Sequence, residues 1–190
     1  MTPLPDQEPY GAVPVQNVFL LPGSIYIAPE PALVTTVLGS CIAVCLWDSV
    51  WKFGGMNHFV LPYAPRGQRS ARYGDIAIEG LINGMRDLGS KTRDLRAKMF
   101  GGASVLPFSD IEKTVGARNI EAALDHLKKS RIRMTSRSVG GTSGLWIRQN
   151  TASGEVSVRR LVLDQAFPRD PHRPTKPAHN DNRPDTTQRG

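Results

Sequence analysis

The first third of the chain contains five short runs of β-branched and aromatic residues, each ended by glycine, proline, aspartate or serine. The runs are NVFLL (17–21), SIYIA (24–28), ALVTTVL (32–38), CIAVCLW (41–47) and MNHFVLP (56–62). Short runs with this punctuation are typical of β-strands. The later segments LRAKMFGGASV, RIRMTSRSV, GLWIRQN and EVSVRRLVL predict further strands, and TASG between the last two predicts a hairpin.

Two segments have the apolar spacing of amphipathic helices. The segment YGDIAIEGLINGMRDLG ends at a glycine, and GARNIEAALDHLKKSR ends in basic residues, which suit the C-terminal end of a helix. Two helices among this many strands predict an α/β domain in which the helices pack on the strands. The residues expected on the apolar faces are Ile76, Leu81, Ile82, Met85 and Leu88 in the first helix and Ile120, Ala123, Leu124 and Leu127 in the second.

The two ends of the chain differ from this pattern. Residues 1–16 contain four prolines and are expected to form an N-terminal arm. Residues 165–190 contain five prolines and only three apolar residues, which cannot bury enough surface to offset the entropy of ordering. We therefore expect a folded domain over residues 17–164 and a disordered tail over 165–190.

The net charge of +7 raises the question of nucleic-acid binding. No zinc-finger spacing, RNA-binding signature or basic stripe with aromatic residues is present, so a solvated basic surface is the simpler interpretation and no specific nucleic-acid partner is expected. The longest unbroken apolar run is seven residues, too short to span a membrane, and the N-terminus does not resemble a secretory signal. A cytoplasmic location, with reduced cysteines, is expected.

Cys41 follows a Gly39-Ser40 pair at the start of an apolar run, and it has four possible roles. A disulfide with Cys45 is disfavoured because the two residues would lie about 13 Å apart on a strand. A metal site is disfavoured because too few ligands accompany the cysteines, and no metal or other cofactor is expected. A buried core thiol suits Cys45 well. For Cys41, a core thiol and an exposed nucleophile both remain open.

A cysteine nucleophile needs a nearby base. His172 and His179 lie in the tail, and His126 is most easily a surface residue of the second helix. His58 stands on a predicted strand that can return beside the strand of Cys41. An isolated histidine there is more often structural, but the pairing with Cys41 favours a catalytic role. Ser40 is the weaker nucleophile because its hydroxyl is not activated.

The blocks TTVLGSC, GGMNHFVLP, YGDIAI, AKMFGGASV and VGARNI, in this order and spacing, resemble the chemoreceptor glutamine deamidases called CheD. The resemblance spans residues 17–162. It implies a mixed β-sandwich flanked by two main helices in α/β/β/α layers, similar to the catalytic domain of the cytotoxic necrotizing factor toxins. It also implies hydrolysis of glutamine carboxamides on methyl-accepting chemotaxis proteins, with release of ammonia and no cofactor.

The resemblance further implies a catalytic triad of Cys41, His58 and a threonine. Thr35, six residues before the cysteine, is preferred, although the adjacent Thr36 would point to the opposite face of the strand. Gly39 and Ser40 are expected in the turn that stabilises the oxyanion. A CheC-type phosphatase is a possible partner, and the alternative function is a non-catalytic chemotaxis interaction module. The run SVGGTSGLW departs from the family pattern, which affects the substrate-contact edge and not the triad.

Overall fold

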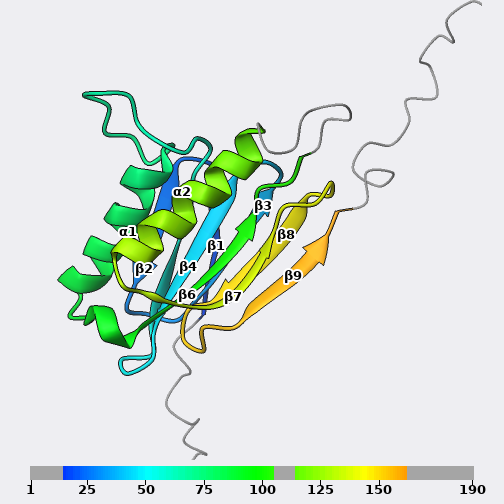
Figure 1. Ribbon diagram of the computed structural model, residues 1–190. Helices are drawn as coiled ribbons and strands as arrows, with labels where there is room; N and C mark the ends of the chain where they lie inside the picture. Colours follow the sequence, from blue (N-terminus) through cyan, green and yellow to red (C-terminus); the bar gives the residue numbers. More distant parts are fainter. Residues whose placement is uncertain (1–14, 105–113, 162–190) are drawn as a thin grey trace, which may run out of the picture.

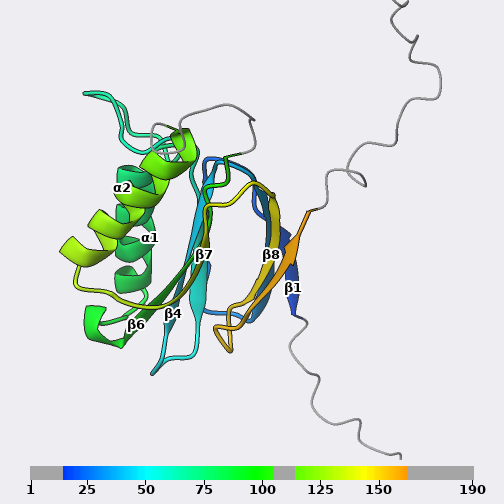
Figure 2. The same ribbon diagram turned by 45° about the vertical axis from the view of Figure 1, so that its right-hand side comes forward.

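Two mixed β-sheets face each other in the computed structural model, which describes residues 15–104 and 114–161 (Figures 1 and 2). The outer sheet has the order β1-β3-β8-β9 and the central sheet has the order β2-β5-β4-β6-β7. The pairs β1–β3 and β6–β7 are parallel and the other pairs are antiparallel. The strands are β1 (Gln16–Phe19), β2 (Ser24–Ala28), β3 (Ala32–Leu38), β4 (Ile42–Asp48), β5 (Gly54–His58), β6 (Leu95–Gly101), β7 (Arg133–Val139), β8 (Leu145–Asn150) and β9 (Val156–Arg160).

Both long helices, α1 (Gly74–Asp87) and α2 (Val115–Lys129), lie on the same face of the central sheet, as Figure 2 shows. A short 3-10 helix, η1 (Thr92–Asp94), precedes β6. The described residues therefore form three layers, α/β/β, with no helix over the far face of the outer sheet. The mixed β-sandwich and its two helices are confirmed, but the expected α/β/β/α layering is wrong. The reason is that α1 and α2 also contact each other, so their apolar faces share one core.

The strand predictions agree closely with the structure. The segments 24–28 and 32–38 are confirmed residue for residue, and the hairpin through TASG joins β8 to β9. The strand of His58 begins earlier than expected, at Gly54, because Gly54 and Gly55 both pair with neighbouring strands. A Cβ at Gly55 would lie 2.6 Å from the carbonyl oxygen of Tyr26, so only glycine fits there. The predicted tail lies outside the described residues, and the likeness to the toxin fold stays a prediction.

Strand β4 is buried on both faces, as its apolar run predicted. Ile42, Val44 and Leu46 face the core under the helices, whereas Ala43 and Cys45 face the core between the two sheets. The two cores thus lie on opposite faces of the central sheet. Cys41, immediately before β4, packs against the core between the sheets. The fold therefore brings the cysteine to one end of the space between the sheets.

The turn after β8 gives a test of this packing. Gly154 has a φ of +72°, and a Cβ there would lie 2.5 Å from the ring of Trp47 on β4. Gly67 has a φ of +86° but nothing within 4 Å of such a Cβ. Both Gly→Ala variants bear the left-handed backbone cost of about 1–2 kcal/mol. We expect Gly154→Ala to lose about 1–3 kcal/mol more through overpacking, measured by urea unfolding. Equal losses would contradict the close contact between Trp47 and the turn.

Candidate active site

His58 ends strand β5 and projects into the space between the two sheets. Its side chain is 1% exposed, and its Nδ1 lies 2.8 Å from the hydroxyl oxygen of Thr36 on the outer sheet. The same hydroxyl donates a hydrogen bond of 2.7 Å to the carbonyl oxygen of Leu20. The imidazole is therefore held by a polar contact that crosses from one sheet to the other.

This arrangement determines which ring nitrogen carries the proton. A threonine hydroxyl has one hydrogen, and the hydroxyl of Thr36 gives it to Leu20. Toward His58 that oxygen must accept, so the neutral imidazole carries its proton on Nδ1. The lone pair then lies on Nε2, which is buried and has no hydrogen-bond partner among the described residues. A buried Nε2 with a free lone pair has the chemistry of a general base.

Burial also sets the charge of the ring. It lowers the pKa of His58 below the ordinary value of 6.5, and a contact with the Leu20 carbonyl opposes this only in part. The imidazole is consequently neutral at neutral pH and able to accept a proton.

The preference for Thr35 as the residue that orients the histidine is wrong. On β3 the side chains of Val34, Thr36 and Leu38 point inward, and Thr35 points to the opposite face. The hydroxyl oxygen of Thr35 instead accepts a hydrogen bond of 3.2 Å from Nε of Arg148 on the neighbouring strand β8. The sequence analysis noted that the two threonines would face opposite sides of the strand, and the structure selects Thr36 for contact with the ring.

Cys41 lies close to His58 in the register of the central sheet. Ile42 pairs with Phe59 and Cys45 pairs with Met56, so His58 stands opposite Ala43 and diagonal to Cys41 on the same face. Diagonal neighbours have Cα atoms about 7–8 Å apart, within reach of long side chains. No hydrogen bond joins the two side chains, because Nε2 has no partner within the described chain. The structure thus brings the thiol and imidazole to one face without closing the contact between them.

The thiol of Cys41 is partly exposed, whereas that of Cys45 is buried. Burial raises the pKa of the Cys41 thiol, while its own backbone N–H and the positive charge of Arg72 lower it. The thiol is therefore protonated at rest and needs a base to form the thiolate. Cys41 is thus not sealed in the interior as Cys45 is.

The turn before β4 is held by hydrogen bonds to three successive carbonyl groups. Gly39 accepts from the backbone N–H of Ala103 at 2.8 Å, Ser40 accepts from the side chain of Asn119 at 3.0 Å, and Cys41 accepts from Gly102 at 2.8 Å. The N–H of Ser40 donates to no acceptor in the described part of the chain. Free N–H groups beside a nucleophile are the donors that stabilise an oxyanion.

Sequence reasoning missed one residue of this site and left the role of another open. Arg72 is exposed and lies between α1 and β5 in sequence, and no pattern in its segment indicates a link to Cys41. Asn119, in the block VGARNI, was open between capping the second helix and contacting substrate; in the structure it occupies the apolar face of α2, three and four residues from Gly116 and Ala123. A polar side chain on the buried face of a helix requires hydrogen-bond partners, and those partners lie at the site.

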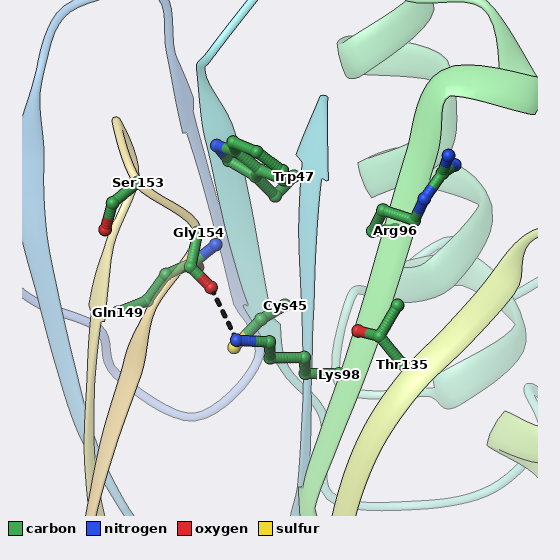
Figure 3. Close-up of a pocket in the computed structure, with 8 residues that line it drawn as sticks. All are labelled: Cys45, Trp47, Arg96, Lys98, Thr135, Gln149, Ser153 and Gly154. Atoms are coloured by element: carbon green, nitrogen blue, oxygen red, sulfur yellow. Dashed lines mark hydrogen bonds between the residues drawn. The ribbon is translucent and has the colours of Figure 1, made fainter. Parts of the chain in front are cut away.

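A cavity of about 140 Å³ lies farther along β4 and is lined in part by Cys45 (Figure 3). It is lined by Trp47 and Lys98, and the ammonium group of Lys98 donates a hydrogen bond to the carbonyl oxygen of Gly154. Burial raises the pKa of Cys45 strongly, so this thiol stays protonated. Within residues 15–104 and 114–161, no group of three or more His, Cys, Asp or Glu side chains is arranged to hold a metal ion. No described helix has the length and apolar character needed to cross a membrane.

Comparisons with known proteins agree on one family. A family model described as CheD chemotactic sensory transduction matches residues 60–160. The chain is 50% identical over 143 residues to a protein of Rhodospirillum rubrum named probable chemoreceptor glutamine deamidase CheD, covering 75% of this chain and 81% of the relative. A Caulobacter vibrioides protein of the same name is 40% identical over 181 residues, covering 93% of each chain. Because that alignment spans nearly the whole sequence, it includes positions 41 and 58, which the family model does not reach.

The buried histidine makes stability depend on pH. Because the folded pKa of His58 is lowered, the unfolded chain binds more protons than the folded chain once the pH falls to about 6.5. We expect the free energy of unfolding to decrease as the pH is lowered through this range and to level off below the folded pKa. Urea unfolding at about pH 7.5 and about pH 5.5 measures this, with His58→Gln as the control. An identical decrease in His58→Gln would assign the effect to other groups.

Proposed function

Because this chain belongs to the CheD family of chemotactic sensory transduction proteins, we propose that it is a protein-glutamine deamidase acting on methyl-accepting chemotaxis receptors. The supporting observation is the hydrogen bond between Thr36 and Nδ1 of His58, which leaves Nε2 as the basic atom on the face shared with Cys41. Relatives in this family carry the name chemoreceptor glutamine deamidase. A basic nitrogen that makes no structural hydrogen bond is expected of a catalyst.

In the first half of the proposed reaction, Nε2 of His58 takes the proton of the Cys41 thiol. The thiolate sulfur attacks the carboxamide carbon of a glutamine side chain and forms a carbon–sulfur bond. The resulting oxyanion accepts hydrogen bonds from N–H groups of the turn at Gly39 to Cys41. The imidazolium returns its proton to the amide nitrogen, the carbon–nitrogen bond breaks, and ammonia leaves a thioester behind.

In the second half, His58 accepts a proton from a water molecule as that water attacks the thioester carbon. The carbon–sulfur bond breaks, and the sulfur recovers a proton from the imidazolium. The glutamine has become glutamate and the enzyme is restored, with no oxidant, reductant or cofactor required. We expect the Cys41 sulfur and Nε2 of His58 to come within hydrogen-bonding distance when substrate binds. Catalytic hydrogen bonds are often long in an empty site.

The resemblance also implies a CheC-type phosphatase as a partner and a cytoplasmic location. Both stay predictions that accompany the proposal. The alternative, an interaction module without catalysis, requires neither a base at His58 nor an accessible thiol at Cys41.

Mass spectrometry of a receptor cytoplasmic domain tests the catalytic proposal directly. We expect wild-type protein to convert defined glutamines to glutamates, each with the mass increase of an amide-to-acid change, and Cys41→Ala to produce none because the attacking sulfur is gone. Cys45→Ala is the matched control, since its thiol lies in the core and should be dispensable. Deamidation that persists in Cys41→Ala, or that is absent from wild type, would end the proposal in favour of a non-catalytic module.

The two adjacent threonines provide a second test. We expect Thr36→Val to lower kcat by about 10- to 100-fold with little change in KM, because the imidazole loses the contact that fixes its proton on Nδ1. Thr36→Ser retains a hydroxyl and should restore most of the activity. Thr35→Val should stay within about twofold of wild type, since its hydroxyl contacts Arg148. A larger effect at Thr35 than at Thr36 would contradict the assigned orientation of His58.

A further inference from the structure

Asn119 on α2 is fully buried and its side-chain amide joins two segments of the active site. Its Nδ2 donates hydrogen bonds to the carbonyl oxygen of Ser40 at 3.0 Å and to the carbonyl oxygen of Val60 at 2.9 Å. Ser40 immediately precedes Cys41, and Val60 follows His58 by two residues. We call this pair of hydrogen bonds the Asn119 bridge.

The orientation of the amide is fixed by its partners. Both are carbonyl oxygens, which only accept hydrogen bonds, so the NH₂ group must face them. The Oδ1 atom of Asn119 is buried and has no partner among the described residues. Leaving such an acceptor unsatisfied costs about 1–3 kcal/mol. The two donated bonds are thus the reason for an amide at this position.

The bridge stands where the backbone ladder between β4 and β5 stops. Ile42 and Phe59 exchange backbone hydrogen bonds of 3.1 and 2.9 Å, and the next facing pair in this register is Cys41 and Val60. Facing pairs in an antiparallel ladder exchange hydrogen bonds alternately, so the next pair that would do so is Ser40 and Leu61. Leu61 instead donates its N–H to the carbonyl oxygen of Arg72, and the carbonyl oxygen of Ser40 accepts from Asn119. The two strands therefore separate at the cysteine, and in the described chain Asn119 is the side chain that donates to both sides of the gap.

We propose that Asn119 is a positioning residue that sets the separation between the turn carrying Cys41 and the strand carrying His58. It touches neither the thiol nor the imidazole and acts through the backbone on each side. Placement within about 1 Å matters greatly for a nucleophile and its base. Without the bridge, Cys41 is free to move away from Nε2 while the rest of the sheet stays intact.

Gln149 offers a matched control because it has the same chemistry elsewhere in the fold. It is also fully buried, donates its Nε2 to the carbonyl oxygen of Leu46 at 3.0 Å, and leaves its Oε1 without a partner in the described chain. It lies at the cavity that contains Cys45, not at Cys41. Loss of its amide should destabilise the protein in the same way without moving the site.

The test uses the full-length protein in three variants, Asn119→Asp, Asn119→Ser and Gln149→Glu. The carboxyl group in Asn119→Asp has at most one donor for two carbonyl oxygens, and the smaller serine side chain also has one. The first readout is the rate of Cys41 alkylation by iodoacetamide across pH, below the melting temperature of each variant. Cys45 serves as the internal measure of folding, since a buried thiol reacts only after unfolding.

For both Asn119 variants we expect alkylation of Cys41 to become slower at neutral pH and its profile to lie at higher pH, because Nε2 of His58 is no longer placed to take the thiol proton as iodoacetamide reacts. We expect kcat for receptor deamidation to fall at least about tenfold, with KM within about threefold of wild type. Gln149→Glu should lower the melting temperature but keep the wild-type alkylation profile and kcat. If Asn119→Asp fails to fold, Asn119→Ser gives the answer, since it introduces no charge.

An unchanged alkylation profile in Asn119→Ser, or an equal shift in Gln149→Glu, would overturn the positioning role. The kcat prediction rests on the proposed deamidase function, whereas the alkylation prediction does not. If the wild-type protein fails to deamidate receptors but its alkylation profile still depends on Asn119, the deamidase function is rejected and the positioning role of Asn119 is retained. Normal deamidation by an Asn119 variant would reject the bridge alone.

Discussion

The hydroxyl group of Thr36 is the contact on which the site depends, because it joins the two sheets and orients the histidine at once. It donates a hydrogen bond to the carbonyl oxygen of Leu20, the residue after β1, and accepts one from Nδ1 of His58 on the central sheet. The direction of one hydroxyl proton determines the tautomer of the imidazole and so the position of the basic lone pair. The distance between the sheets therefore determines the orientation of His58 as well as the packing of the core. A change that separates β3 from β5 would remove the contact that orients His58.

Burial acts on both members of the proposed catalytic pair and favours their neutral forms. It lowers the pKa of His58 and raises the pKa of Cys41. A resting thiolate–imidazolium pair is therefore disfavoured, and the proton must move when the substrate arrives. The exposed charge of Arg72 and the N–H of Cys41 itself reduce the cost of forming the thiolate. A thiol that stays protonated until then is also less open to oxidation, which proceeds through the thiolate.

The sequence was sufficient to predict the strands and both helices, because each rests on a local pattern, and it named Cys41 and His58 as candidate residues. It was insufficient to predict which face of β3 points inward. The run ALVTTVL has apolar side chains on both faces, Val34 and Leu38 on one and Leu33 and Val37 on the other. Only pairing with β1 and β8 decides which set faces inward, and with it whether Thr35 or Thr36 contacts His58. The placement of both helices on one face is likewise a consequence of contacts distant in sequence.

The helix α2 shows why these distant contacts matter for chemistry. Its N-terminus is capped by Thr114, whose hydroxyl accepts from the N–H of Ala117, so the first turn is well defined and carries Asn119 inward one turn later. Gly101, with a φ of +104°, lets the end of β6 lie close against the backbone of Cys41, where a Cβ would meet the Cys41 carbonyl oxygen, and a Cβ at Gly102, with a φ of +73°, would meet the side chain of Ile120. The turn of Cys41 is therefore held by backbone donors just after β6 and by an amide from α2, while His58 comes from β5 and the hydroxyl that contacts it from β3. Because each contribution comes from a different element, the geometry of the site exists only when the complete three-layer fold has formed.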